Sequence, residues 1–456
     1  MNSPISNIES LRRVHCVGIG GIGVSAIALM LKERGVAVTG SDASESYVAE
    51  SLRSKGIPVA QGHSAAHVPE DIDCLIYTIA VPTTNPERQE AARRGVPEMS
   101  YPEMLGLVSS RMKTIAVSGT HGKTTTTAMI SKAMIDCGLD PTVVVGSFMN
   151  DPKREVRRNF ISGASDYLVV EACEYRRSFL NLFPTILVIT SIEEDHLDYY
   201  KDLADIQNAF TEIASRVPAD GAIVCDAADP AVAFVLAETK NRGSTAKIID
   251  YAEYLKGSAD GTDKAQALTL KVPGEHNRRD AAAARAVLHF LGADDAKVCE
   301  SLRGFGGTWR RFEYKGELKV AAAQAAKVYD DYAHHPTEIR ATLQGARELF
   351  PQGHIVAIFQ PHLYSRTKDL FSEFSEAFSD ADEILLAPIY AARETPDPSI
   401  DSEMLAEAIR AQGKKAHSFP DLVAVAAEAK ALKADIIVVM GAGDVTKVSD
   451  MLVEQK

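Results

Sequence analysis

A glycine-rich loop between an apolar strand and a helix restricts the fold of this chain more than any other feature. Residues 114–118 read Thr-Ile-Ala-Val-Ser, a short β-type run, and a helical pattern begins after Lys123. Between them lies Gly119-Thr120-His121-Gly122-Lys123-Thr124. A strand, a glycine turn and a helix in this order are typical of α/β domains built on a parallel sheet.

The same loop has the chemistry of a phosphate site. Backbone amides of such a turn cradle phosphate oxygens, a lysine adds positive charge, and a hydroxyl reaches Mg²⁺. Lys123 and Thr124 stand at these positions, although Val117 replaces the first glycine of the G-x-x-x-x-G-K-[ST] pattern. Because Lys123 lies on a loop, we expect Lys123→Ala to lower turnover by several powers of ten with little effect on folding. The predicted ATP-binding loop is Gly119, Thr120, His121, Gly122, Lys123, Thr124 and Thr125.

Strands and helices alternate along the whole chain. Strands are expected at 14–19, 36–39, 74–80, 114–118, 167–171, 185–190, 327–330, 355–359 and 435–440. Helices are expected at 24–34, 280–291 and 336–349, and a turn-rich exposed excursion at 255–266. At about 150 residues per domain, a chain of 456 residues fits three domains. We predict an α/β protein with domains at 1–110, 111–313 and 314–456.

Composition and charge exclude several classes of protein. The chain is 46% hydrophobic and 24% charged, as soluble globular proteins are. A formal net charge of −13 argues against a basic nucleic-acid surface. Six scattered cysteines without a C-x-x-C pair argue against a zinc site and a disulfide framework. Because the N-terminus lacks a signal pattern and no apolar run is long enough to span a membrane, we expect a cytoplasmic protein.

A second glycine loop lies near the N-terminus. Gly18-Ile19-Gly20-Gly21-Ile22-Gly23 matches G-x-G-x-x-G between a strand and a helix, and Asp42 follows the next strand. Its glycines let backbone amides approach a pyrophosphate. Alone, the pattern indicates an NAD-binding domain, but any nucleoside diphosphate offers the same group. The loop therefore predicts a diphosphate ligand without identifying it, and tight strand–helix packing is the alternative explanation for the glycines.

Carboxylates and a histidine follow two later strands. The strand 167–171 ends at Glu171, with Glu174 beyond it, and the strand 185–190 leads into 193–198, which contains His196. Mg²⁺ prefers carboxylate and phosphate oxygens. We predict Thr124, Glu171 and His196 as metal ligands, with a solvated surface group as the alternative for each carboxylate.

Longer motifs run in one order along nearly the whole chain. They are GIGGIG (18–23), GTHGKTTT (119–126), EACEYRRSFL (171–180), EEDHLDYY (193–200), GEHN (274–277), RRFE (310–313), DDYAHHPTE (330–338), FQPHLYSRT (359–367) and MGAGD (440–444). In this order they resemble the Mur ligase family of ATP-dependent peptidoglycan amide ligases. The resemblance implies a Rossmann-like first domain for the UDP of a sugar nucleotide, a central P-loop ATPase-like domain for ATP and two Mg²⁺ ions, and a Rossmann-like third domain on the amino-acid side.

The resemblance also implies a reaction. UDP-N-acetylmuramate is phosphorylated by ATP on its lactyl carboxylate, and the amine of L-alanine attacks the acyl phosphate, releasing ADP and phosphate in total. The alternative within the family is the wall-recycling ligase that adds a whole tripeptide. From other classes, an NAD-linked dehydrogenase and a non-catalytic ATP-binding switch are the rivals. We expect no nucleic-acid or membrane partner, and a monomer or weak homodimer.

The resemblance also implies, position by position, which residues contact ATP. His276 and Asn277 are implied on the adenine side, where Asp280 replaces an asparagine and cannot donate as an amide does. Arg310 or Arg311 is implied at ATP and Asp331 at the ribose. The alternative for the arginine pair, beside the only tryptophan, Trp309, is cation–π packing.

Roles on the substrate side are implied in the same way. The implied UDP-sugar site is Gly18, Gly20, Gly21, Gly23 and Asp42. The third-domain motifs imply that His334, His335, His362 and Arg366 line the reacting groups, with Lys123 and His196 completing the catalytic set. Many relatives have an arginine where this chain has Leu363. Arg176 and Arg177 are possible substitutes, as is the basic stretch Lys153, Arg154, Arg157 and Arg158, for which a solvated helix face is the favoured explanation.

Overall fold

The computed structural model describes residues 5, 7–151, 156–255, 268–318, 325–392 and 394–453. In this part of the chain the strands form three sheets, each covered by helices, which confirms the predicted α/β class. The sheets occupy residues 13–100, 113–250 and 313–440. Two compact units result: Met1–Leu268 with Asp280–Arg303, and Thr269–Arg279 with Gly304–Lys456. The boundaries at 110 and 313 remain predictions.

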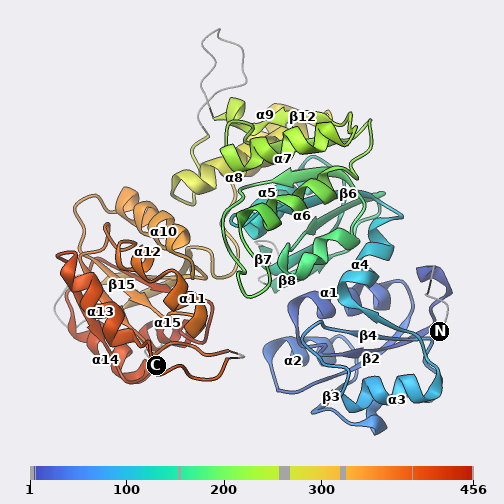
Figure 1. The fold of residues 1–456 in the computed structure, drawn as a ribbon, viewed down its shortest axis with the longest axis horizontal. Helices are drawn as coiled ribbons and strands as arrows, with labels where there is room; N and C mark the ends of the chain where they lie inside the picture. The colour runs from blue at the N-terminus through green and yellow to red at the C-terminus, as the bar shows by residue number, and fades with distance from the viewer. Residues whose placement is uncertain are drawn as a thin grey trace. The chain divides into compact units, whose positions relative to one another are not determined.

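The first sheet is parallel, with the strand order β3-β2-β1-β4-β5. Its elements are η1 (Ile8–Ser10), β1 (Arg13–Val17), α1 (Ile22–Glu33), β2 (Ala37–Asp42), α2 (Tyr47–Ser54), β3 (Val59–Gln61), η2 (Ala65–His67), β4 (Cys74–Tyr77), α3 (Pro86–Arg94), β5 (Glu98–Ser100) and α4 (Tyr101–Ser109). Helices α1 and α3 lie on opposite sides of this sheet (Figure 1). The predicted strand 14–19 ends at Val17 because Gly18, with a φ of 73°, turns the chain.

The second sheet has the order β12-β11-β10-β6-β9-β7-β8 and is parallel except for the β7–β8 pair. Its elements are β6 (Lys113–Ser118), α5 (Lys123–Asp136), β7 (Thr142–Asp151), β8 (Val156–Ile161), β9 (Tyr167–Glu171), η3 (Tyr175–Asn181), β10 (Pro184–Ile189), α6 (Leu203–Ala214), β11 (Ala222–Cys225), α7 (Pro230–Asn241), β12 (Lys247–Asp250), η4 (Tyr251–Tyr254), α8 (Glu275–Phe290) and α9 (Asp295–Arg303). Buried apolar residues of the first two sheets join in one cluster. Asn159 of β8 reinforces it by donating to the carbonyl of Ile22 and to the Ser25 hydroxyl, both at 2.7 Å.

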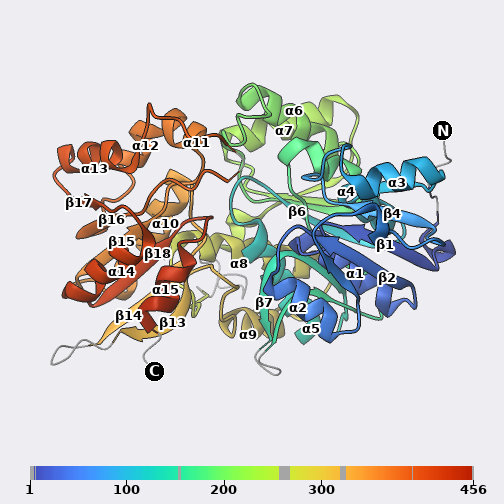
Figure 2. The same cartoon turned by 90° about the horizontal axis from the view of Figure 1, so that it is seen from below.

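The third sheet has the order β13-β14-β18-β15-β16-β17, with only β13 antiparallel to its neighbour among the described strands. Its elements are β13 (Glu313–Leu318), β14 (Ala326–Asp331), α10 (Pro336–Leu349), β15 (Ile355–Phe359), α11 (Tyr364–Asp369), α12 (Phe371–Ser375), β16 (Glu383–Leu386), α13 (Ser402–Ala411), β17 (Lys415–Ser418), α14 (Leu422–Ala431), β18 (Ile436–Met440) and α15 (Thr446–Val453). Helices α12 and α13 cover one face, and α14 and α15 the other (Figure 2). Alternate residues of the buried strands face these two layers.

Three expectations about local structure need correction or fall outside the described residues. Helix α8 begins at Glu275, five residues before the predicted start at 280. Arg157 and Arg158 belong to strand β8, so the basic stretch is not a helix face, and Lys153 and Arg154 lie outside the described residues. Apart from Leu255, so does the excursion at 255–266. Among the described helices, none is both long and apolar enough to cross a bilayer.

Candidate active site

The phosphate loop joins β6 to α5, as its glycine pattern predicts. Gly119 and Gly122 have φ angles of 135° and 80°, which residues with a side chain rarely adopt. A Cβ atom at Gly122 would lie 2.5 Å from Oδ1 of Asp280 on α8. Gly122 also caps α5, so that the anion-favouring helix N-terminus follows directly. Asp280, expected at adenine, therefore lies against the phosphate loop.

The neighbouring loop residues are held by the segment after β10. Thr120 accepts from the backbone N–H of Glu193 at 2.8 Å, and the N–H of His121 donates to the Ser191 hydroxyl at 3.1 Å. Thr125 is buried in the first turn of α5. Hydrogen bonds within the protein thus fix the backbone of the loop.

Lys123 is largely buried beneath the loop. Its Nζ atom donates to the carbonyl oxygens of Gly119 and Thr120, at 2.5 and 3.0 Å, and to Oε1 of Glu174 at 3.0 Å. Burial opposes the positive charge, but the nearby carboxylate of Glu174 outweighs it and holds the pKa of Lys123 above its ordinary value. Lys123 is therefore charged at neutral pH and anchored, not a free lysine on a surface loop.

Thr124 faces the end of strand β9. Its hydroxyl oxygen lies 3.1 and 3.0 Å from the two carboxylate oxygens of Glu171. The backbone N–H of Gly146 donates to Oε2 of Glu171 at 2.9 Å and orients the carboxylate. A hydroxyl and a carboxylate beside a phosphate loop offer the hard oxygen donors that Mg²⁺ prefers, so these two residues fit the predicted metal site.

His196 lies near Glu174, the carboxylate that pairs with Lys123. Its Nε2 atom is 3.7 Å from Oε1 of Glu174 and 3.7 Å from Oδ2 of Asp195, and its ring lies 4.7 Å from that of Tyr175. The φ of His196 is 55°, an uncommon conformation for a residue with a side chain. Glu174 thus joins the lysine and the histidine, a role that the sequence did not assign to it.

Two arginines follow Glu174 in left-handed backbone conformations. Arg176 and Arg177 have φ angles of 51° and 55°. The guanidinium of Arg177 donates to Asp205 on α6 at 2.5 Å, and that of Arg176 lies 5.5 Å from the Tyr175 ring centroid. The Arg177 guanidinium is therefore already paired with a carboxylate, and its predicted contact with substrate remains a prediction.

The first glycine loop joins β1 to α1. Gly21 caps α1, and the N–H of Gly20 donates to Oδ2 of Asp42 at 2.8 Å. A Cβ atom at Gly20 would lie 2.7 Å from that oxygen, and one at Gly23 would lie 2.7 Å from the Tyr101 ring. Close packing therefore accounts for glycine at these two positions, and the diphosphate ligand remains a prediction.

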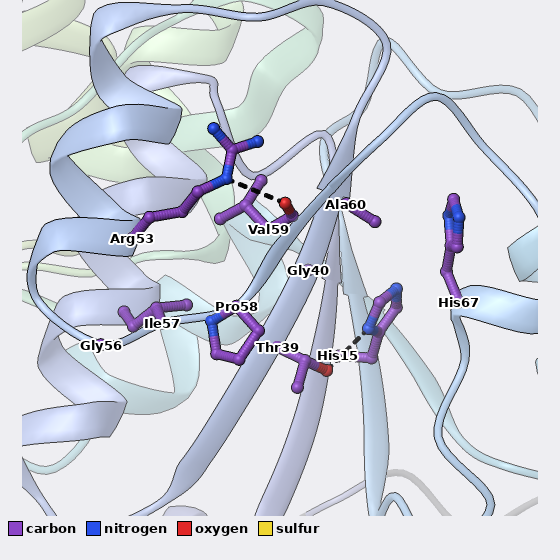
Figure 3. A pocket seen from close by; sticks show the side chains of 10 residues that line it. All are labelled: His15, Thr39, Gly40, Arg53, Gly56, Ile57, Pro58, Val59, Ala60 and His67. Atoms are coloured by element: carbon purple, nitrogen blue, oxygen red, sulfur yellow. Dashed lines mark hydrogen bonds between the residues drawn. The ribbon is translucent and has the colours of Figure 1, made fainter.

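A separate cavity of about 560 Å³ opens in the first domain, with His15, Arg53 and His67 among its lining residues (Figure 3). None of residues 18–23 lines it. Behind His15 lies the fully buried Glu87, which accepts from Ser41 at 2.6 Å and lies 3.0 Å from Nε2 of His15. Burial alone would raise the pKa of Glu87, but these hydrogen bonds and the backbone N–H of Ser64 hold it at about 2. No sequence pattern pointed to this buried charge.

In the second unit, Arg310 and Arg311 differ in burial and in their partners. Arg310 is 4% exposed, and it donates to Oδ1 of Asp330 at 2.9 Å and to the carbonyl oxygens of Gly441 and Gly443 at 2.5 and 3.3 Å. Arg311 is less buried, 3.6 Å from a carboxylate oxygen of Glu338. Arg310 therefore holds the ends of two strands together, and only Arg311 remains a candidate for ATP.

Tyr332 is an aromatic partner of both arginines. The guanidinium carbons of Arg310 and Arg311 lie 5.2 and 5.4 Å from the Tyr332 ring centroid. The predicted cation–π packing of the arginine pair therefore exists, with Tyr332 as a partner.

Asp331 is buried at the end of β14. Its two oxygens accept from the backbone N–H groups of Phe312 and Ala333, each at 2.8 Å. Burial raises the pKa of Asp331 to about 6, against the opposing effect of Arg311 and these two hydrogen bonds. Asp331 shapes the turn between strand and helix, and its predicted ribose contact remains a prediction.

His276 and Asn277 lie in the first turn of α8. Burial lowers the pKa of His276 to about 4, so the ring is neutral at pH 7. The side-chain amide of Asn277 donates to the carbonyl of Pro273 at 2.5 Å and lies 3.0 Å from Nε2 of His276. The two predicted adenine residues are thus adjacent and ordered.

The four predicted third-domain residues follow the ends of β14 and β15. The rings of His334 and His362 are 6.0 Å apart, and Nη1 of Arg366 lies 3.4 Å from Nδ1 of His362. His335 is buried and caps α10 through a hydrogen bond from the N–H of Thr337. The structure therefore brings His334, His362 and Arg366 together, while His335 shapes the helix start.

Comparison with known proteins explains why these motifs occur together. The description "Mur ligase family, catalytic domain" matches residues 13–113, "Mur ligase middle domain" matches 117–288, and "Mur ligase, glutamate ligase domain" matches 310–443. The chain is also 41% identical over 464 residues to the UDP-N-acetylmuramate--L-alanine ligase of Clostridium novyi, covering 98% of both chains.

The chain belongs to the Mur ligase family.

Other members of the Mur ligase family agree over the full length. A protein with the same printed name from Salinibacter ruber is 41% identical over 460 residues, covering 97% of this chain and 95% of its own. The crystal structure of the UDP-N-acetylmuramate-alanine ligase from Thermotoga maritima matches with a TM-score of 0.76 and 31% identity, covering 97% of this chain and 98% of that one. A murein peptide ligase from Psychrobacter arcticus, at 23% identity and a TM-score of 0.67, shares the fold.

Proposed function

We propose that this protein is an ATP-dependent ligase that joins L-alanine to the lactyl carboxylate of UDP-N-acetylmuramate. The observation that carries the proposal is 41% identity, over 98% of both chains, to a ligase of this name. The phosphate loop with Thr124 facing Glu171 supports it, because carboxylate activation by ATP requires a phosphate site beside a metal site. The tripeptide-adding alternative is not favoured, since relatives at 39–41% identity over nearly the full chain carry the L-alanine ligase name.

The reaction follows from the poor reactivity of a carboxylate. A lactyl oxygen attacks the γ-phosphorus of ATP, forming an acyl phosphate and ADP. The nitrogen of L-alanine then attacks the acyl carbon, and the carbon–oxygen bond to phosphate breaks as the amide forms and the amine proton is lost. Charge gathers on phosphate oxygens in both steps, and Lys123 would stabilise it.

Each ligand has a candidate binding site. ATP would bind the loop 119–125, with Asn277, Arg311 and Asp331 as further candidates, and the UDP group would bind the loop 18–23. Mg²⁺, which neutralises phosphate charge, would be held by Thr124 and Glu171, and a second ion by His196. His334, His362 and Arg366 would meet the reacting groups. A cytoplasmic location and a monomer or weak homodimer remain expectations.

Acceptor-dependent phosphate release tests the proposal. We expect release from ATP and Mg²⁺ only when UDP-N-acetylmuramate and L-alanine are both present, with glycine, L-serine and the tripeptide L-Ala-D-Glu-meso-diaminopimelate as comparison acceptors. Release with the tripeptide alone would assign the protein to wall recycling. No release with any acceptor would contradict a ligase activity.

A further inference from the structure

Glu174 is a buried carboxylate that the family motifs leave without a role. It lies three residues beyond the end of β9 and is 3% exposed. Its backbone carbonyl accepts from the Tyr200 hydroxyl at 2.5 Å and from the N–H of Arg177 at 2.9 Å. The backbone at Glu174 is therefore fixed from two directions.

One oxygen of Glu174 contacts two residues of the proposed ATP site. Oε1 lies 3.0 Å from Nζ of Lys123 and 3.7 Å from Nε2 of His196. Oε2 is buried and has no hydrogen-bond partner within the described part of the chain. A buried carboxylate oxygen without a partner is costly, so this arrangement is not one that stability alone would select.

The turn after Glu174 supports the same conclusion. Arg176 and Arg177 adopt left-handed backbone conformations that cost free energy for residues other than glycine. They are kept there in part by the hydrogen bond from Arg177 to Asp205 on α6. Strain of this kind persists where a side chain must be held in a set position, and here the side chain at the start of the turn is Glu174.

We propose that Glu174 is a positioning residue that competes with nucleotide phosphates for Lys123 and, once released, orients His196. The inference rests on the proposed function. Lys123 has three N–H groups, and they are directed to the carbonyls of Gly119 and Thr120 and to Glu174. A phosphate that recruits Lys123 must displace one of these acceptors. Glu174 is the one whose negative charge the phosphate replaces.

Release of Lys123 leaves Glu174 beside His196. A carboxylate that accepts the N–H of an imidazole fixes the ring and directs its other nitrogen outward, as partners of metal-binding histidines do. Glu174 would then hold the Nε2 side of His196, which would leave Nδ1 as the nitrogen that could bind a metal ion. Glu174 would thus pair with Lys123 before nucleotide binds and orient His196 after it binds.

The decisive variant is Glu174→Gln, tested first by calorimetric titration with ADP without Mg²⁺. Since the neutral amide no longer competes for Lys123, we expect the Kd for ADP to fall about tenfold, the change that loss of one charged hydrogen bond produces. We expect kcat in the complete reaction to fall about 10- to 100-fold, as for other residues that orient metal-binding histidines. Tighter nucleotide binding with slower turnover distinguishes this role from structural damage, which weakens both.

Two further variants keep the inference testable. Glu174→Asp keeps the charge, so its Kd for ADP should stay within about twofold of the original protein, because a competing carboxylate remains. Glu212→Gln is the matched control on α6, where Glu212 pairs with the exposed Arg216, and it should change neither quantity. An ADP affinity that is unchanged or weaker in Glu174→Gln would overturn the inference. If the unmodified protein itself fails to bind ADP with Mg²⁺, the proposed function fails instead.

Discussion

The hydroxyl of Thr124 lies 3.1 and 3.0 Å from the two carboxylate oxygens of Glu171, although 47 residues separate them in sequence. Their strands explain the proximity. β6 and β9 are parallel neighbours, with Val117 paired to Glu171, so their carboxyl ends meet at one edge of the sheet. Thr124 lies in the first turn of the helix that follows one strand, and Glu171 ends the other. Ligand sites of parallel α/β sheets form at such edges.

Substitution of Glu171 by glutamine tests this pair as a metal site. The amide keeps the volume of the carboxylate but loses its charge and one acceptor oxygen. We expect the Mg²⁺ concentration for half-maximal ligase activity to rise at least about tenfold, since a loss of 1.4 kcal/mol in binding is tenfold. Mg²⁺ titration of initial rates measures this. Glu238→Gln, on α7 outside the site, is the control; an identical titration in Glu171→Gln would exclude Glu171 as a ligand.

Replacement of Lys123 by alanine should impair both turnover and folding. We expect turnover to fall by at least about 10²- to 10³-fold, because charge developing on phosphate loses its main partner. The structure changes the expectation for stability, since Glu174 would be left as a buried charge without Lys123. A loss of about 2 kcal/mol or more in the free energy of unfolding is expected.

The double variant Lys123→Ala/Glu174→Gln separates these two effects. Removing the unpaired carboxylate should recover much of the stability and none of the turnover. Thermal unfolding of both variants measures the recovery. Equal melting temperatures in the single and double variants would show that the ion pair does not stabilise the fold.

Arg310 and Arg311 should behave oppositely despite being adjacent. Arg310→Ala leaves Asp330, which is fully buried, without its ion-pair partner, at a cost of about 3–5 kcal/mol in unfolding free energy. Arg311→Ala should change stability by less than about 1 kcal/mol, because the side chain is partly exposed, and should raise the KM for ATP. Fluorescence of the single tryptophan, Trp309, follows unfolding beside both sites. A stable Arg310→Ala protein would contradict its structural role.

Ionisation of the Asp331 carboxyl should lower the free energy of unfolding as pH rises. Its pKa is about 6 in the folded protein and 3.8 as the ordinary value, so between these pH values the folded state binds more protons than the unfolded state. Its stabilising contribution is present below pH 4 and is lost as pH rises through 6. Asp331→Asn removes this dependence.

Urea unfolding of both proteins at a series of pH values between 4 and 7 measures the effect. Relative to Asp331→Asn, the unmodified protein should lose roughly 3 kcal/mol at most across this range. A difference that grows in favour of the unmodified protein as pH rises would contradict the burial argument.

Local patterns were sufficient for the α/β class and for the most apolar strands and helices. The strands 167–171 and 355–359 and the helix 336–349 match the structure residue for residue, because apolar runs bounded by glycine, proline and polar residues report burial directly. The start of α8 was missed because Glu275 to Arg279 are polar, and no apolar period marks the first turns of this helix.

The candidate site could be predicted only where a motif carries its own chemistry. The lysine, threonine and glycines of the phosphate loop are of this kind. Glu174, by contrast, is one acidic residue among 62 in the sequence, and only its burial against Lys123 and His196 distinguishes it. Arg310 and Arg311 are indistinguishable in sequence as well, and packing assigns one to the interior.

The sequence by itself determined the α/β class, the strands and helices with a clear apolar pattern and the two glycine loops, since these depend on periodicity and on backbone conformations that glycine tolerates best. The tertiary structure alone decided which charged side chains meet. Lys123 and Glu174 are 51 residues apart, and Arg310 and Asp330 are 20 apart, so neither pair has a sequence period. Coulomb energy falls with distance and rises with burial, and both quantities exist only once the sheets have formed.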